Sequence, residues 1–363
     1  KLHTTKTAKK VTAIAMDTDD LFEKLENITD MKELDIMIQR MLNSTDMQNY
    51  DIVTAHQFAM LLDQEYYEPY NSWIKVGWAL HNVSDYNILS WIKFSSQSDK
   101  FDLTSITGMI SEWEKMRDEG LTLASLRYWA KNCNPTGYAD LYNKNMDLFL
   151  EEVVNSEGAD WDLAMLAKFL YGDKIRCVDP KANIWYIFRR GLWQKDVNGL
   201  HLRKYLSAKM SKLFINREKK LVDVLRDASW DGDADKQQET TALTNTYNKI
   251  ALKLKKSSDK NNVMNESKAL FHDKDLVNKL DANPYTIGFN NGIFDFENAE
   301  FREGRPEDYI SRSTNIDYID YKNADFDEQK EFCEKFMEQL FPDNNLREYM
   351  LSLIHISEPT RPP

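Results

Sequence analysis

The segment KIRCVDPKANIWYIFRRGLWQKD (174–196) decides the fold class of this chain, because the spacing of its apolar residues changes there from helical to alternating. It contains three short runs of β-branched and aromatic residues, which predict three strands over 174–179, 183–190 and 192–196. Gly191 stands between the second and third runs, where a tight reversal favours a residue that tolerates positive φ. The segment therefore predicts short hairpins inside an otherwise helical chain.

The sequence before this segment has helical periodicity. Residues 1–48 indicate a polar linker followed by a helical hairpin, with Asp30 and Glu33 as a capping box at the start of the second helix. Tryptophan is frequent in the next part, and helical spacing occurs in four stretches, 70–84, 85–98, 109–120 and 121–132. Asn134-Pro135-Thr136-Gly137 has strong turn chemistry and closes this block. We therefore predict an all-helical domain over 49–142.

The remaining sequence predicts a second domain over 146–350 that mixes helices with short hairpins. Its helices are expected at 146–155, 160–172, 200–225, 239–256, 266–280, 326–340 and 344–353. A second β segment, TIGFNNGIFDFENAEFREGRP (286–306), lies among them. The predicted fold class is α+β and mostly helical, with an all-α N-terminal domain followed by a mixed α/β domain with short hairpins.

The composition is that of a globular protein, with 42% hydrophobic and 12% aromatic residues. Three cysteines lie far apart in the sequence, which leaves neither a disulfide framework nor a CxxC metal site. No apolar run approaches the roughly 18 residues of a membrane-spanning helix, so we expect no membrane contact. The net charge of −12 disfavours a general polyanion binder, yet residues 201–260 hold 14 Lys and Arg against 8 Asp and Glu.

The sequence lacks the motifs of nucleotide hydrolysis and of metal catalysis. None of the 12 glycines precedes a lysine, which excludes a phosphate loop of the GxxxxGK type. Asp231, Asp233 and Asp235 begin like a calcium loop, but later positions lack its Gly and Glu, which favours an acidic surface turn. Asp17 and Asp19 lack the sheet and further ligands of a two-metal site, which favours helix capping. We expect no catalytic, cofactor-binding or metal-binding residue in this chain.

A basic block is the remaining positive signal, because its cations alternate with apolar residues. The candidates for DNA contact are Arg189 and Arg190 at the hairpin tip together with Arg203, Lys204, Lys209, Lys212, Arg217, Lys219 and Lys220. A second cluster contains Lys249, Lys253, Lys255 and Lys256. Two interpretations remain open: the solvated faces of two amphipathic helices, or a surface that contacts nucleic-acid phosphates.

The order of segments resembles a known family. The chain resembles the C-terminal helical domain of archaeo-eukaryotic-type primases in three stretches, WIKVGWALHN (73–82), SWIKFSSQSDKF (90–101) and GLTLASLRYWAK (120–131). The chain also resembles poxvirus-type primase-helicases of large DNA viruses, in the region that precedes their superfamily-3 helicase. The stretches that carry this resemblance are NIWYIFRRGLW (183–193), NPYTIGFNNGIFDFEN (283–298) and FREGRPEDYISRST (301–314). The helix that leads into the ATPase core is similar to FPDNNLREYMLSL (341–353).

The resemblance implies that the chain is a piece of a longer viral primase-helicase, with a primase catalytic domain before it and an ATPase core after it. It implies ATP and Mg²⁺ as cofactors of the longer protein, outside this chain. It also implies DNA as a partner, a hexameric homo-oligomeric ring formed through the helicase core, and an intracellular location in the host cytoplasm or at the viral replication site. The alternative is a stand-alone, non-enzymatic module for DNA binding or oligomerisation.

The last residues depart from the family pattern. IHISEPTRPP (354–363) resembles translated sequencing-adapter sequence, and its prolines end the preceding helix without a cap. We therefore expect residues 351–363 to be a non-native tail that does not belong to the fold.

Overall fold

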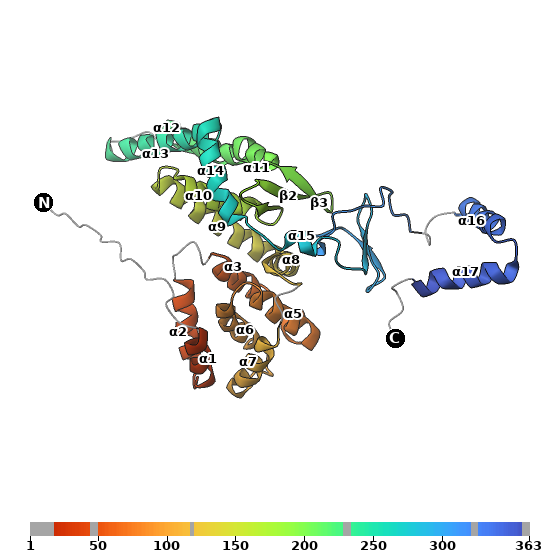
Figure 1. Cartoon of the computed structure of the whole chain (residues 1–363). Coiled ribbons are helices and arrows are strands. Elements are labelled where there is room, and N and C mark those ends of the chain that lie inside the picture. The colour runs from red at the N-terminus through yellow and green to blue at the C-terminus, as the bar shows by residue number, and fades with distance from the viewer. Residues whose placement is uncertain (1–17, 44–49, 117–119, 228–233, 321–325, 358–363) are drawn as a thin grey trace. The chain divides into compact units, whose positions relative to one another are not determined.

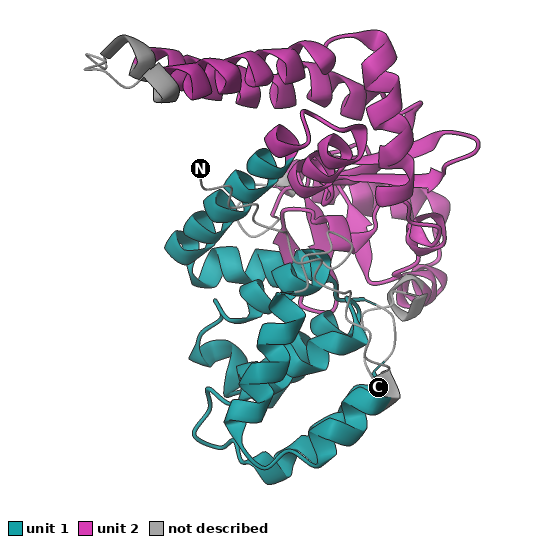
Figure 2. Cartoon of the chain, turned by 90° about the vertical axis from the view of Figure 1, so that its left-hand side faces the viewer, with its two compact units in different colours: residues 1–152 teal, residues 153–363 magenta. Residues whose placement is uncertain are grey.

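The chain divides into two compact units, residues 1–152 and residues 153–363, which Figure 2 shows in teal and magenta. The structure is a computed structural model, and it describes residues 18–43, 50–116, 120–227, 234–320 and 326–357. The predicted fold class is confirmed: an all-helical first region is followed by helices and two small antiparallel sheets of three strands each.

The described part of unit 1 is helical (Figure 1). Its helices are α1 (Thr18–Glu26), α2 (Met31–Leu42), α3 (Tyr50–Ala59), α4 (Gln64–Tyr67), α5 (Tyr70–His81), α6 (Ile88–Ser95), α7 (Ile106–Glu114), α8 (Leu123–Cys133) and α9 (Pro135–Asn155). Single 3₁₀ turns, Asp85–Asn87 and Leu103–Ser105, lead into α6 and α7. A helix lies in each of the four stretches predicted between residues 70 and 132, but α7 ends at Glu114, before the predicted end at 120, and 117–119 lie outside the described residues.

Tryptophan side chains form the centre of the core of unit 1. Trp91 of α6 and Trp113 of α7 are fully buried, and their ring centroids lie 5.6 Å apart. Trp91 also stacks on Trp73 of α5, with 4.6 Å between the centroids. A Cβ atom added to Gly77 would lie 2.5 Å from the Trp91 ring, so close packing requires glycine at this position of α5.

The start of α2 differs slightly from the predicted capping box. Asp30 caps the helix as predicted, because its Oδ1 accepts a hydrogen bond of 3.0 Å from the backbone N–H of Lys32. The Glu33 carboxylate, however, accepts from the N–H of Thr29 at 3.3 Å rather than from that of Asp30. The reciprocal bond of a capping box is therefore displaced by one residue.

The segment Asn134–Gly137 begins a helix, whereas we predicted a closing turn. The Asn134 side-chain oxygen accepts a hydrogen bond of 2.9 Å from the N–H of Gly137, and Pro135 occupies the first position of α9. Proline suits that position because the N–H it lacks has no partner within the helix. The predicted helix 146–155 is thus the second half of a longer one, and the prediction failed because Asn-Pro opens helices as well as turns.

Unit 2 combines helices with both sheets. Its elements are α10 (Asp160–Tyr171), β1 (Ile175–Asp179), β2 (Ile184–Arg189), β3 (Leu192–Val197), α11 (Leu200–Tyr205), α12 (Ser211–Asp227), α13 (Ala234–Lys253), α14 (Ser257–Leu270), α15 (Leu276–Lys279), β4 (Thr286–Gly288), β5 (Ile293–Asp295), β6 (Glu300–Arg302), α16 (Asp327–Leu340) and α17 (Asn344–Ser357). A π-helical turn, Leu206–Met210, connects α11 to α12. Figure 1 shows α12 and α13 side by side.

The first sheet has the strand order β1-β2-β3 and the predicted tight reversal. Arg189 pairs with Leu192, which leaves Arg190 and Gly191 as a two-residue turn with φ angles of 52° and 78°. Positive φ at both positions is the geometry of a type I′ hairpin, and it explains the glycine. The second sheet has the order β4-β5-β6, so both predicted β segments are confirmed.

Backbone hydrogen bonds tie distant segments to the first sheet. The N–H of Cys177 in β1 donates to the carbonyl of Phe271 at 2.8 Å, and the N–H of Asp273 donates to the carbonyl of Cys177 at 3.0 Å. The chain that leaves α14 therefore lies along β1. Trp193 of β3 donates from its backbone N–H to Ile310 and from its indole N–H to Pro306, both at 2.8 Å.

Several helix bounds in unit 2 differ from the predicted ones. α13 and α14 begin at Ala234 and Ser257, before the predicted starts at 239 and 266. The predicted helix 266–280 is not continuous, because α14 ends at Leu270 and the short helix α15 begins only at Leu276. α17 continues to Ser357, so the first residues of the expected non-native tail are helical, while 358–363 lie outside the described residues. No helix in the described part of the chain has the length and apolar character needed to cross a membrane.

Candidate nucleic-acid interface

The β2–β3 hairpin tip is attached to α11 through a chain of polar contacts. The Arg189 guanidinium lies 2.7 Å from His201 Nε2, and His201 Nδ1 lies 3.0 Å from the buried carboxylate of Asp196. Because arginine only donates hydrogen bonds, Nε2 must accept, which places the imidazole proton on Nδ1 and directs it to Asp196. The Asp196 carboxylate also accepts from the backbone N–H of His201 at 3.1 Å. Asp196 therefore positions both α11 and the side chain of Arg189.

The predicted DNA-contact residues of α11 and α12, together with the π-helical turn, form what we call the α11–α12 surface. Its members are Arg203, Lys204, Lys209, Lys212, Arg217, Lys219 and Lys220. Lys204, Lys209, Lys212, Lys219 and Lys220 are exposed, whereas Arg203 and Arg217 are half-buried. The apolar residues between them, such as Met210 and Phe214, are buried, as expected for amphipathic helices.

Arg203 and Lys209 are among the cations of this surface that have partners within the unit. Arg203 donates to the side-chain oxygen of Asn261 at 2.7 Å, which fixes it against α14. The Lys209 ammonium lies 4.4 Å from the centroid of the Tyr205 ring, in a cation–π contact. In the described part of the chain, Lys204, Lys212, Lys219 and Lys220 have no ion-pair partner.

One lysine of the second predicted basic cluster, Lys253, makes contacts within unit 2. Lys253 donates to the carbonyl of Gly158 at 2.6 Å and pairs with Asp160 at 2.9 Å. Its charge therefore connects α13 to the start of α10. The α11–α12 surface extends well beyond the hairpin tip. Tyr205 and Lys220 are about 22 Å apart along a helix that rises about 1.5 Å per residue, so the far end of the surface does not form one patch with the tip.

A cavity of about 400 Å³ lies between the hairpin tip and the second sheet. Lys174, Arg189 and Arg190 line it, together with Tyr205 of α11 and Asn290 of the β4–β5 turn. Lys174, Tyr205 and Asn290 were not predicted as site residues. Lys174 was the first residue of the predicted strand 174–179 and Asn290 lay within the predicted β segment 286–306, so nothing local in the sequence showed that they meet Arg189.

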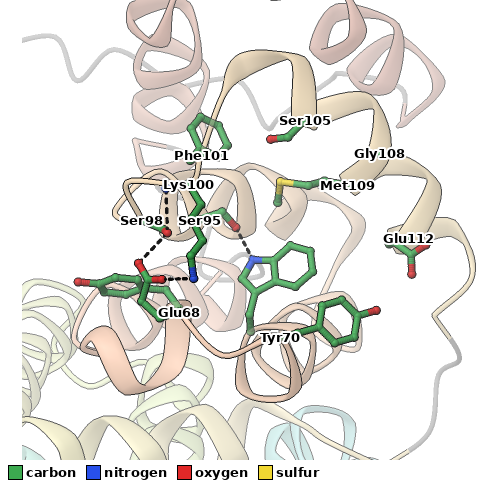
Figure 3. Close-up of a pocket in the computed structure, with 12 residues that line it drawn as sticks. Glu68, Tyr70, Ser95, Ser98, Lys100, Phe101, Ser105, Gly108, Met109 and Glu112 are labelled. Carbon is green, nitrogen blue, oxygen red and sulfur yellow. Dashed lines mark hydrogen bonds and ion pairs between the residues drawn. The ribbon is translucent and has the colours of Figure 1, made fainter.

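A second cavity, of about 500 Å³, lies in unit 1 and is aromatic (Figure 3). Tyr70, Trp73 and Phe101 are among its lining residues. The Lys100 ammonium at its edge lies 2.6 Å from the Glu68 carboxylate. Hydrogen bonds from Lys100 and from Ser98 lower the pKa of Glu68, so the carboxylate stays charged and paired. This cavity therefore offers no excess of positive charge to a phosphate.

The described residues contain no group of three or more His, Cys, Asp or Glu side chains that would hold a metal ion. Asp17, Asp231 and Asp233 lie outside the described residues, and Asp19 lies in the first turn of α1. Burial raises the pKa of the Cys133 and Cys177 thiols to about 11, which keeps both protonated and unreactive at neutral pH.

Two protein families match the chain in consecutive segments. The family described as Primase C terminal 2 (PriCT-2) matches residues 55–130. The family described as D5 N terminal like matches residues 164–342. The first match covers α3 to α8 of unit 1, and the second covers unit 2 from α10 to α16, including both sheets and the α11–α12 surface.

Several curated viral proteins are similar to the chain over most of its length. "Putative helicase L207/L206" of Acanthamoeba polyphaga mimivirus is 29% identical over 310 residues, which cover 84% of this chain and 31% of the viral protein. "Putative helicase 121R" of Invertebrate iridescent virus 3 is 26% identical over 340 residues, 83% of this chain and 35% of its own length. "Putative primase C962R" of African swine fever virus is 26% identical over 299 residues, 73% of this chain and 30% of its own length.

The chain thus spans about a third of the length of the relatives it matches. The matched segments follow the order in which the sequence resembled a primase C-terminal domain and a pre-helicase region. The chain therefore carries a primase C-terminal 2 domain followed by a D5 N-terminal-like domain, and over much of its length it is a distant homologue of the helicase- and primase-named proteins of nucleocytoplasmic large DNA viruses.

Proposed function

We propose that this chain is the part of a viral DNA-replication protein that couples a primase domain to an ATP-dependent superfamily-3 helicase core. The order of its two domains carries the proposal, because a primase C-terminal domain and a D5 N-terminal-like domain follow each other in one chain. A protein that primes and unwinds the same strand needs a segment that keeps the two activities together and guides DNA between them.

In this proposal the catalytic chemistry takes place outside residues 1–363. The sequence contains no Gly-Lys pair, so ATP and Mg²⁺ would bind to the helicase core, which would also form the hexameric ring. The helices α16 and α17 are proposed to contact that core or a neighbouring subunit, because Phe332, Phe336 and Tyr349 are exposed on them. Exposed aromatic surface is typical of sites that contact other protein.

Within this chain, the α11–α12 surface is proposed to contact DNA. Exposed lysines that have no ion-pair partner among the described residues, such as Lys212, Lys219 and Lys220, can bind phosphates without first breaking an internal salt bridge. Binding of this kind is independent of base sequence and weakens as salt rises, because counterions released from the DNA drive it. We expect weak affinity, since the chain as a whole carries a net charge of −12.

The double variant Lys219→Glu, Lys220→Glu tests this assignment. Fluorescence anisotropy of a labelled single-stranded oligonucleotide, measured from low to moderate salt, gives the affinity and its salt dependence. The log–log salt slope of the variant should be smaller by about 1.4, since each lost phosphate contact on a single strand contributes about 0.7. The matched control is the double variant Lys181→Glu, Lys274→Glu, which changes the net charge by the same amount at two exposed positions outside the α11–α12 surface.

Equal losses in both double variants would contradict the assignment, because they would show that only net charge matters. Unchanged binding in the Lys219→Glu, Lys220→Glu variant would assign these lysines to a solvated helix face. Circular dichroism of each variant checks that the helices remain folded, which we expect because exposed substitutions usually change the free energy of unfolding little.

A further inference from the structure

The walls of the cavity between the hairpin tip and the second sheet are held together by close backbone contacts and hydrogen bonds. The turns that contain Gly191 and Gly304 touch backbone to backbone, and a Cβ atom on Gly304 would lie 2.6 Å from the Gly191 carbonyl oxygen. Trp193, next to this contact, is held by its two hydrogen bonds to Pro306 and Ile310, each of 2.8 Å. Lys174, which immediately precedes β1, therefore lines one space of about 400 Å³ together with residues of the β2–β3 turn and the β4–β5 turn.

The charges on these walls favour an anion. Lys174, Arg189 and Arg190 all line the cavity and are exposed, and none of them forms an ion pair with a carboxylate in the described part of the chain. Glu303 is the acidic side chain among the lining residues. Two guanidinium groups and an ammonium group in a concave site are well suited to bind a phosphate, since guanidinium donors match phosphate oxygens in pairs.

The remaining walls favour a base and a sugar next to that phosphate. Phe188 and Tyr205 supply aromatic surface, and Asn290 supplies an amide. The volume falls within the roughly 300–1,000 Å³ typical of small-molecule sites. Base–aromatic contacts stabilise single-stranded nucleic acids without base preference. Glu303 suits an amino or hydroxyl donor of the base or sugar, away from the phosphate.

From these observations we infer that this cavity is a mononucleotide-binding site, in which Lys174, Arg189 and Arg190 hold the phosphate and Phe188 and Tyr205 contact the base. His201 acts as a positioning residue, because it holds Arg189 through its bond to the buried Asp196. The nucleotide is either free or part of a single strand. The inference goes beyond the proposed function, since it requires no contact between DNA and the α11–α12 surface.

Calorimetric titration of the whole chain with thymidine 5′-monophosphate tests the site. We expect saturable binding of the monophosphate, and binding of thymidine or inorganic phosphate that is weaker by about tenfold or more. Arg190→Gln should lower the affinity for the monophosphate about tenfold, because it removes one phosphate contact at an exposed turn position. The matched control is Lys195→Gln on the same hairpin, which does not line the cavity and should bind as the unchanged chain does.

Competition identifies the source of the nucleotide. An oligothymidylate without terminal phosphates that displaces the monophosphate would assign the site to a strand, whereas displacement by free nucleotides alone would assign it to a free nucleotide.

Glu303→Gln should bind the monophosphate more tightly, because it removes the opposing charge. No heat of binding with millimolar monophosphate, or equal losses in Arg190→Gln and Lys195→Gln, would overturn the inference. The Lys219→Glu, Lys220→Glu variant should keep the site, so the two proposals can fail separately.

Discussion

The two cavities of this chain use similar residue types for different ends. In the aromatic cavity of unit 1, Lys100 is paired with Glu68 at 2.6 Å, and Glu112 is paired with Lys115 at 2.9 Å. In the cavity of unit 2, the cations Lys174 and Arg190 have no such partners among the described residues. A cation that is already paired gains little from a phosphate, because it must first give up its partner. The charged side chains named in the unit 1 cavity are thus neutralised by ion pairs, whereas Lys174 and Arg190 leave positive charge available to a ligand in the unit 2 cavity.

The largest expected effect concerns the packing side of this comparison. Trp91→Ala should lower the free energy of unfolding of unit 1 by about 3–5 kcal/mol, because the ring is fully buried between Trp73 and Trp113. Hydrogen exchange resolved by residue measures this loss separately for each unit. The control is Tyr70→Ala, which removes an aromatic ring that is 62% exposed and should cost far less. A comparable loss in both variants would show that the buried tryptophans do not dominate the stability of unit 1.

Burial of His56 in unit 1 is expected to make the free energy of unfolding depend on pH. Burial, and then the nearby charge of Lys93, lower the pKa of His56 from 6.5 to about 4. The unfolded chain therefore takes up a proton near pH 6.5 that the folded chain does not bind until about pH 4. Stability is complete above pH 6.5 and falls, by up to about 3 kcal/mol, as the pH decreases towards 4.

Chemical denaturation from pH 7 to pH 4 measures this loss as the difference between the unchanged chain and His56→Gln. The carboxylates titrate alike in both proteins, so the difference isolates the imidazole. The His56→Gln variant should lose less stability between pH 6.5 and pH 4 than the unchanged chain. Parallel curves would mean that His56 is protonated in the folded state as readily as in the unfolded one.

The smallest expected effect compares one glycine from each cavity. Gly304→Ala should destabilise unit 2 by about 1–3 kcal/mol, because the new methyl group would meet the backbone of Gly191 at 2.6–3.1 Å. Gly108→Ala in α7 meets nothing within 4 Å, so it should stabilise unit 1 by about 0.5–1 kcal/mol. Thermal unfolding of both variants tests the opposite signs. A neutral Gly304→Ala variant would show that the joint between the two turns is not rigid.

Local patterns in the sequence were sufficient for most of the secondary structure. The alternation over 174–196 and the position of Gly191 predicted the three strands and their tight turn, because hairpin geometry depends on neighbouring residues. Helical spacing around Trp73 and Trp91 predicted the helices of unit 1 for the same reason. The error at Asn134–Gly137 arose because one local signal suits two structures, and the choice between them depends on the residues that pack against the segment.

The fold class, the order of the two domains and the positions of the cations could therefore be established from the amino-acid sequence. Tertiary packing decides which of these cations are available: it pairs Lys253 with Asp160 and Arg203 with Asn261, while Lys219 stays exposed. It also brings Lys174 and Asn290, more than a hundred positions apart, to the walls of one cavity. Periodicity reports short-range backbone preferences, whereas ion pairs and cavities depend on which distant side chains meet, and this is decided only when the whole unit packs.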